Sequence, residues 1–537
     1  MKKSLFFMSA IAALVMTGCS SEEPAPGPNE GGSAEGNSYM AITISNLSVG
    51  SRAATVGEPE FENAATGSTE GKITAENLYF FFFDQNGNAF PLVYEQVNGA
   101  EVVTNMVKPL AEEFEDGTSE GDGKDQTVTG ILVLGKPGEG YVGEVPAQVL
   151  CVANPYTDVM RNLENKTLAS VLATRATPPA SWDGKATNFV MTSASYIKDG
   201  ALKVTDDVTP HIKGTPEAAK ADPVQINIER LAAKVRVTYA ASYPVQKRTT
   251  NEAGVEVVEN PGKFTIDNVA DQELEVVING WQLYNTATQA NAFKQLNADY
   301  TFNPTWTWND PTNKRSYWAE SNPGANLRKT DWDLYNDAHF TNKSFNAATP
   351  VENVVYCYEN TKFPDLAATD RTVNKATGIV IKATVRKKGE TAGINLMRWN
   401  GAYYTLDALK DKAAKQWSAN NSNAAYDVAN VEFVQDAGKN TYHAIYHISQ
   451  DNTQVIPLFT DILWWIDGVT SYYTNVEHLG GLSGVVRNHI YDYVIDGLIG
   501  LGIPGNKPDV PEETQHYVAC HVRVLNWHVV KNTVTLE

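Results

Sequence analysis

Two histidines at a spacing used by zinc enzymes stand in the stretch YHAIYH, residues 442–447. His443 and His447 are four residues apart, a separation that places two metal ligands on one face of a helix. The zinc-protease motif needs a glutamate directly after the first histidine as general base, and Ala444 occupies that position. The alternation of the stretch is also typical of a strand. We therefore expect structural roles for both histidines.

A second set of candidate metal ligands lies in DQNGNAFPLVYE, residues 84–95. The residues at calcium-loop positions one, three, five and twelve are Asp84, Asn86, Asn88 and Glu95. Ala89 stands at position six, where the sharp turn calls for glycine, and Pro91 follows soon after. Asn86-Gly87 is instead typical of a two-residue hairpin turn, because both residues tolerate a positive φ. We predict a hairpin here and no metal.

The chain offers no pattern that marks a catalytic site. It has no GxSxG elbow, no phosphate-binding loop and no GxGxxG after a strand. Carboxylates are plentiful, so a catalytic pair of the glycosidase type remains an alternative. Trp464 and Trp465 could stack on sugars, although tryptophans of this kind are more commonly buried in a core. We expect neither an enzyme nor a cofactor.

Composition describes a folded, acidic protein. The chain has 537 residues, 42% hydrophobic and 10% aromatic content, and a formal charge of −20. This length suggests two or three domains, and the apolar content is enough for real cores. Nucleic-acid binding needs clustered Lys and Arg, so the acidic balance argues against it.

The first residues are typical of a secreted lipoprotein. Lys2 and Lys3 precede an apolar run that is too short to span a bilayer, and Thr17-Gly18-Cys19 then resembles a bacterial lipobox. This predicts a signal peptide over residues 1–18, acylation of Cys19 and a flexible tether over 19–38. The membrane is then contacted only through the lipid. Cys151, Cys357 and Cys520 lie far apart, which favours core positions over disulfides or a zinc site.

Short strands separated by Gly, Asn and Asp dominate the remaining chain. The pattern restarts at VQINIERLAAKVRV, so we place a domain boundary near Pro223, with domains over 39–222 and 223–503. The best helix candidate is YTLDALKDKAAKQW, residues 404–417. Such spacing favours all-β sandwiches with short helices in loops.

The two ends of the folded chain carry matching strand patterns. Near the first end, Met40, Ile42 and Ile44 alternate with small or polar residues. A proline-rich spacer follows residue 503, and the last strand then offers the same alternation through Val518, Cys520, Val522 and Val524, with Trp527 and Val529 in register after a bulge. Either this strand is an edge of its own sandwich, or it pairs with another molecule.

Several motifs in order resemble the fimbrillins of the Bacteroidales, nearest within that family to the major, shaft-forming subunits of minor fimbria, which are type V pili. They are SYMAITIS, INIERLAAKVRV, INGWQLYN, YCYENT, VVRNHIYDYVI and VRVLNWHVV. The resemblance implies two transthyretin-like Greek-key β-sandwiches, no enzyme activity, and a lipoprotein precursor at the outer membrane that becomes a cell-surface fimbrium.

The resemblance also implies assembly by strand exchange. An arginine-specific protease would cut between Arg52 and Ala53, so that residues 39–52 leave with the lipid. The donor strand in 504–537 of another copy would then fill the vacated place. The implied partners are further copies, anchor and tip subunits, the protease, and host or bacterial receptors. A monomeric glycan-binding surface lipoprotein and a secreted glycoside hydrolase are the alternatives; Arg52 would then be an ordinary linker residue.

Overall fold

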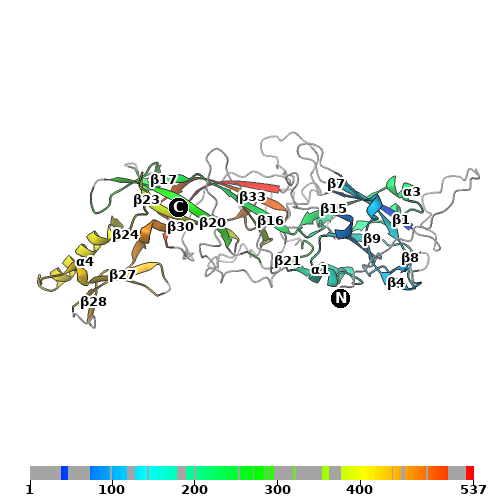
Figure 1. Ribbon diagram of the computed structural model, residues 1–537, viewed down its shortest axis with the longest axis horizontal. Helices are drawn as coiled ribbons and strands as arrows, with labels where there is room; N and C mark the ends of the chain where they lie inside the picture. The colour runs from blue at the N-terminus through cyan, green and yellow to red at the C-terminus, as the bar shows by residue number, and fades with distance from the viewer. Residues whose placement is uncertain are drawn as a thin grey trace, which may run out of the picture.

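The computed structural model describes residues 38–45, 73–117, 127–177, 189–295, 353–361, 376–505 and 528–536, apart from gaps of one to five residues, together with residues 319 and 321. These residues form a mostly β protein with several sheets and few helices, as predicted. Figure 1 shows an elongated arrangement. The strands of the first half lie at one end, the sheet of the second half lies in the middle, and α4 lies at the other end.

The first half is organised by a nine-stranded sheet in the order β5-β2-β9-β11-β15-β1-β7-β6, with β14 beside β9. Its strands are β1 (Ser38–Ser45), β2 (Leu78–Phe83), β5 (Met106–Val107), β6 (Glu115–Gly117), β7 (Thr127–Leu134), β9 (Gln148–Ala153), β11 (Met191–Ser193), β14 (Asp206–Asp207) and β15 (Val224–Arg230). The strand nearest the start of the described chain therefore lies inside the sheet.

Small elements surround this sheet. The minor strands are β3 (Leu92–Glu95), β4 (Glu101–Thr104), β8 (Lys136–Pro137), β10 (Arg175–Ala176), β12 (Tyr196–Lys198) and β13 (Ala201–Lys203). The helices are α1 (Thr157–Arg161), α2 (Leu168–Leu172) and α3 (Pro216–Lys220), with 3-10 turns η1 (Ala75–Asn77), η2 (Ala111–Glu113) and η3 (Thr209–His211).

The aromatic run in β2 is buried on both of its faces. Phe80 and Phe82 join one apolar cluster, while Phe81 and Phe83 join a second cluster beneath α1 and α2. Successive side chains of a strand point to opposite faces, so four consecutive buried aromatics need a core on each side. This places β2 in the middle of a layered first half.

The second half is organised by an eleven-stranded sheet. Its strands are β16 (Ala232–Thr238), β17 (Ser242–Thr250), β18 (Glu256–Glu259), β19 (Lys263–Phe264), β20 (Gln272–Tyr284), β22 (Asn353–Tyr358), β23 (Gly378–Lys387), β30 (Val469–Asn475), β33 (His489–Ile499), β34 (Ile503–Pro504) and β35 (His528–Leu536). Short pairs are formed by β10 with β21 (Ala290–Asn291) and by β31 (Glu477–His478) with β32 (Leu482–Ser483).

A six-stranded sheet covered by α4 is appended to the second half (Figure 1). Its strands are β24 (Leu396–Trp399), β25 (Ala402–Tyr404), β26 (Val431–Gln435), β27 (Thr441–His447), β28 (Val455–Pro457) and β29 (Ile462–Trp465), and the 3-10 turns η6 (Val428–Asn430) and η7 (Ile466–Gly468) flank them. The predicted helix is confirmed as α4 (Leu406–Asn420): Thr405 caps it by accepting the Ala408 N–H, and Leu409, Ala413 and Trp417 form its buried face. Within the described part of the chain, no helix is both long and apolar enough to cross a membrane.

The structure differs from the sequence-based expectations at the turn after β2 and at the domain boundary. The turn after β2 is not a two-residue hairpin, because only Gly87 of the Asn86-Gly87 pair has a positive φ, and the loop closes between Phe83 and Ala89. The expected division at Pro223 falls directly before β15, which pairs in the first sheet; β16 is the first strand of the second sheet. Leu231, between β15 and β16, is buried where the two halves meet.

Candidate functional site

The place of β1 in the first sheet is the candidate site. We call the space that β1 fills the first-strand lane, bounded by Thr127–Leu134 of β7 and Val224–Asn227 of β15. All eight residues of β1 pair antiparallel with β7, from Ser38 opposite Leu134 to Ser45 opposite Thr127. On the other side, Ile42–Ser45 run parallel to β15. The lane is therefore an interior position with a ladder on both sides.

The side chains of β1 complete the core of the first half. Met40 and Ile42 are 0% and 1% exposed and belong to the same apolar cluster as Leu132 of β7 and Ile226 of β15. Burying two such side chains contributes about 1.5–3 kcal/mol each. Ala41, which points to the opposite face, is buried as well. The strand expected from the alternation of Met40, Ile42 and Ile44 is thus confirmed as β1, and its residues Met40–Ile42 belong to the core.

An empty lane would be costly. Without β1, the facing edges of β7 and β15 would lose their ladder partners beside an uncovered strip of core. Another extended segment could restore both if it supplied backbone hydrogen bonds and apolar side chains at alternate positions. The geometry therefore has the properties of a strand-binding site that the chain occupies with its own β1.

The last strand lies in the second half. β35 runs parallel to β33, with His528 opposite His489 and Val529 opposite Ile490 (Figure 1). Val529, expected in a donor strand, is therefore paired within its own chain here. The other expected donor residues, Val518, Cys520, Val522, Val524 and Trp527, lie outside the described residues, as do Cys19, Arg52 and Ala53.

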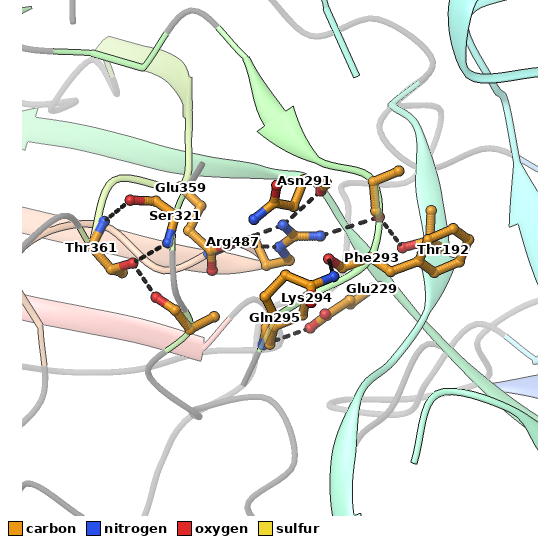
Figure 2. A network of polar contacts seen from close by, with 12 residues as sticks. Thr192, Glu229, Asn291, Phe293, Lys294, Gln295, Ser321, Glu359, Thr361 and Arg487 are labelled. Carbon is orange, nitrogen blue, oxygen red and sulfur yellow. Dashed lines mark hydrogen bonds and ion pairs between the residues drawn. The ribbon is translucent and has the colours of Figure 1, made fainter. Parts of the chain in front are cut away.

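A buried polar network joins the two halves (Figure 2). Arg487, 0% exposed, precedes β33 and donates from Nε to Glu359 Oε2 at 3.1 Å. It also donates from Nη2 to the Asn291 carbonyl at 2.8 Å and from Nη1 to the Ala292 carbonyl at 3.3 Å. The Ala292 carbonyl accepts a further bond, at 2.7 Å, from Thr192 of β11 in the first half. One backbone segment thus bridges both halves.

A second buried ion pair lies beside this network. Lys294 Nζ is 2.8 Å from Glu229 Oε2, and both side chains are almost fully buried. Burial raises the pKa of the Glu229 carboxyl, while the charges of Lys294 and Arg487 act in the opposite direction. Glu229 lies in β15, the parallel neighbour of β1. The strand that forms this wall of the first-strand lane over Val224–Asn227 is therefore tied to the second half through Glu229.

Sequence reasoning missed this junction. Glu359 and Arg487 are 128 residues apart, and Glu229 and Lys294 also come from separate elements, so no local spacing marks them. The one available signal was the charged pair Glu229-Arg230 at the end of an alternating strand, where a buried position demands a partner.

The residues that resemble a zinc motif and a calcium loop have structural roles instead. His443 and His447 lie on strand β27, and each pairs with its own carboxylate: His443 Nδ1 with Asp436 at 2.7 Å and His447 Nε2 with Glu432 at 2.8 Å. Because strand residues four apart are separated by about 13 Å, the two rings cannot share one ion. Among the described residues, no cluster of three metal-binding side chains occurs.

Asp84 is used by its own loop. Its carboxylate accepts hydrogen bonds from the backbone N–H groups of Asn86 and Asn88, both at 2.8 Å, and from Asn88 Nδ2 at 2.9 Å. Partial burial acts to raise the pKa of Asp84, but the hydrogen bonds from Asn88 and Asn86 outweigh it, so the pKa is lowered. Cys151 and Cys357 are buried, in keeping with core positions.

Comparisons with known proteins give distant structural similarities. A candidate cell adhesion protein from Parabacteroides distasonis is 11% identical, with 93% of this chain and 98% of that chain covered and a TM-score of 0.32. A fimbrial assembly protein from the same species is 12% identical (78% and 98% covered, TM-score 0.28). The tip fimbrial protein Mfa3 from Porphyromonas gingivalis, truncated at its C-terminus, is 11% identical (67% and 82% covered, TM-score 0.28).

No family model matches the chain, and no curated protein matches it. All three TM-scores are below 0.5, which marks these structural similarities as distant.

Proposed function

We propose that this chain is a structural subunit of a cell-surface fimbria, of the shaft type, which polymerises by strand exchange. The observation that carries the proposal is the position of β1. It fills an interior lane and supplies core residues, yet it belongs to the chain segment that precedes Arg52. Cleavage after Arg52 would sever the covalent link that holds this strand, and a vacated lane would need another strand.

The proposed occupant is the tail of a second copy. The alternation of Val518, Cys520, Val522 and Val524 matches that of Met40, Ile42 and Ile44 in binary pattern. For Val529 to take part as well, β35 has to leave β33. The proposal thus includes two exchanges: a first strand leaves with the lipid on Cys19, and a last strand moves from its own sheet to a neighbour.

The remaining parts of the proposal follow from this assembly. The precursor is an outer-membrane lipoprotein that an arginine-specific protease cuts between Arg52 and Ala53, and the two halves are transthyretin-like sandwiches. The mature subunit is held in the fimbrium by its neighbours, including anchor and tip subunits, and supports adhesion to host or bacterial surfaces. It has no catalytic step and needs no cofactor.

A denaturing gel of the surface fraction, run with and without boiling, tests the proposal. We expect a ladder of high-mass species that collapses on heating. Arg52→Ala should leave lipidated monomers, whereas Arg161→Ala, which removes an exposed arginine at the end of α1, should leave the ladder intact. A ladder that persists in Arg52→Ala would contradict cleavage-triggered assembly.

The tail needs its own variant, because trimming residues 516–537 also removes β35 from the second sheet. Val522→Asp leaves the β35 sequence unchanged and places a charge in the expected donor strand. It should abolish the ladder, while Thr514→Asp in the spacer should not. Monomers under every condition, together with specific glycan binding, would favour the monomeric glycan-binding lipoprotein; glycan hydrolysis lost on one carboxylate change would favour the hydrolase.

A further inference from the structure

Residues 209–222, which we call the strap, lie against the start of β1. The strap contains η3 and α3, begins after β14 and ends where β15 begins. Lys213 bridges Tyr39 through two backbone hydrogen bonds, from the Tyr39 N–H to the Lys213 carbonyl and from the Lys213 N–H to the Tyr39 carbonyl, both at 2.8 Å. Helix α3 packs against β1 and β7.

The bridge to Lys213 completes one side of the first-strand lane. The ladder between β1 and β15 begins only at Ile42 opposite Val224, so β15 does not reach Tyr39. Lys213 supplies the acceptor and the donor at that position. The strap is thus an extension of the lane wall, built from a turn instead of a strand.

Ion pairs between charged side chains join the two ends of the strap. Asp222, the last strap residue, is 2.9 Å from Lys213 Nζ and 3.0 Å from His211 Nδ1. The hydrogen bond from Lys213 is the largest cause lowering the pKa of Asp222, so this carboxylate is charged at neutral pH. Lys213 Nζ also donates to the Pro210 carbonyl at 2.7 Å. These contacts hold Lys213 where it meets Tyr39.

The strap is fixed to the body at two further points. Ile212 and Ala219 are buried, and Ile212 belongs to the same apolar cluster as Met40 and Ile42. Lys220 Nζ is 2.7 Å from Glu113 Oε2 in η2, although both side chains are substantially exposed. The buried contacts anchor the strap, while its charged contacts face water and are weaker.

Building on the proposed strand exchange, we propose that the strap is a latch on the first-strand lane, which holds the amino end of whichever strand occupies the lane and must open before that strand leaves. Its backbone contacts do not depend on the Tyr39 side chain, so the latch accepts any residue with an N–H. It excludes proline at this position, because proline has no N–H to donate to the Lys213 carbonyl. An incoming strand of a second copy would meet the same requirement.

Hydrogen exchange of the full-length monomer tests the latch without any need for polymers. Asp222→Asn removes the charge that holds Lys213 and His211, and should speed exchange of the amides in residues 38–45 by about fivefold. Glu217→Gln, the same change of charge on an exposed position of α3, is the matched control and should leave these amides unchanged. Equal rates in wild type and Asp222→Asn, or equal acceleration by Glu217→Gln, would overturn the proposal.

A reversible crosslink tests the same contact by strengthening it instead of weakening it. Paired backbones of this kind bring Cα atoms to about 5.5 Å, within reach of a disulfide. Tyr39→Cys with Lys213→Cys should oxidise readily and slow exchange in residues 38–45, and reduction should restore it. Failure to oxidise in the folded protein would also overturn the latch. Because both experiments read a monomer, they distinguish failure of the latch from failure of the proposed polymerisation.

Discussion

Arg487→Met is expected to lower the free energy of unfolding by about 3–5 kcal/mol, because it leaves Glu359 buried without its cation. The substitution also removes the donors to the Asn291 and Ala292 carbonyls, through which the second half contacts the first. Urea unfolding followed by tryptophan fluorescence measures the loss. Hydrogen exchange in residues 290–295 should become faster as well, since this segment loses the hydrogen bonds that Arg487 donates to it.

Two further variants separate charge burial from general damage. Arg487→Met with Glu359→Gln removes both charges and should recover part of the loss, because a neutral side chain is cheaper to bury than an unpaired carboxylate. Arg161→Met removes an exposed arginine and should change stability by less than about 0.5 kcal/mol. A loss below about 1 kcal/mol in Arg487→Met would contradict the view that this network holds the halves together.

The second large effect is expected in the first-strand lane. Met40→Ala with Ile42→Ala removes two fully buried side chains from β1, and large-to-small changes of this kind cost about 2–5 kcal/mol each. The loss falls on the contact between β1 and the rest of the sheet. We expect much faster hydrogen exchange in residues 38–45 and in the facing strands β7 and β15, with little change in β2 and β9.

Val103→Ala is the matched control for this pair. Val103 lies in β4, also in the first half, and its side chain is 53% exposed, so its truncation should cost less than about 0.5 kcal/mol. Under the proposed function, the double variant should also assemble faster once the chain is cut, because its first strand leaves more easily. Unchanged exchange at β7 and β15 would show that β1 does not support the sheet.

The sequence predicts individual elements better than it predicts their neighbours. Alternation at Met40, Ile42 and Ile44 is enough to identify β1, and the run 404–417 is enough to identify α4. Neither pattern could show that β1 pairs with strands about ninety and 180 residues further along the chain. Sheet neighbours depend on long-range packing, which one strand's side chains do not encode.

The turn after β2 and the junction around Arg487 were not predicted correctly. Asn86-Gly87 favours a tight hairpin by propensity, but the Asp84 carboxylate accepts three hydrogen bonds within the loop and stabilises a wider turn. β35 (His528–Leu536) extends beyond Val529, and the expected donor residues before it lie outside the described residues, so the donor strand stays a prediction. The junction around Arg487 could not be predicted from residue spacing, because its members come from separate elements that meet only after folding.

A reversible lock on β1 tests the central claim most directly. Thr43 of β1 pairs with Thr129 of β7, so Thr43→Cys with Thr129→Cys puts both substitutions at one ladder position, where a disulfide would tie β1 to β7. If a strand from a sister copy must replace β1, oxidised subunits cut after Arg52 should remain monomers, and reduction of the same sample should start polymerisation. Polymers that form equally well with the disulfide intact would show that β1 never has to leave, and would contradict the account.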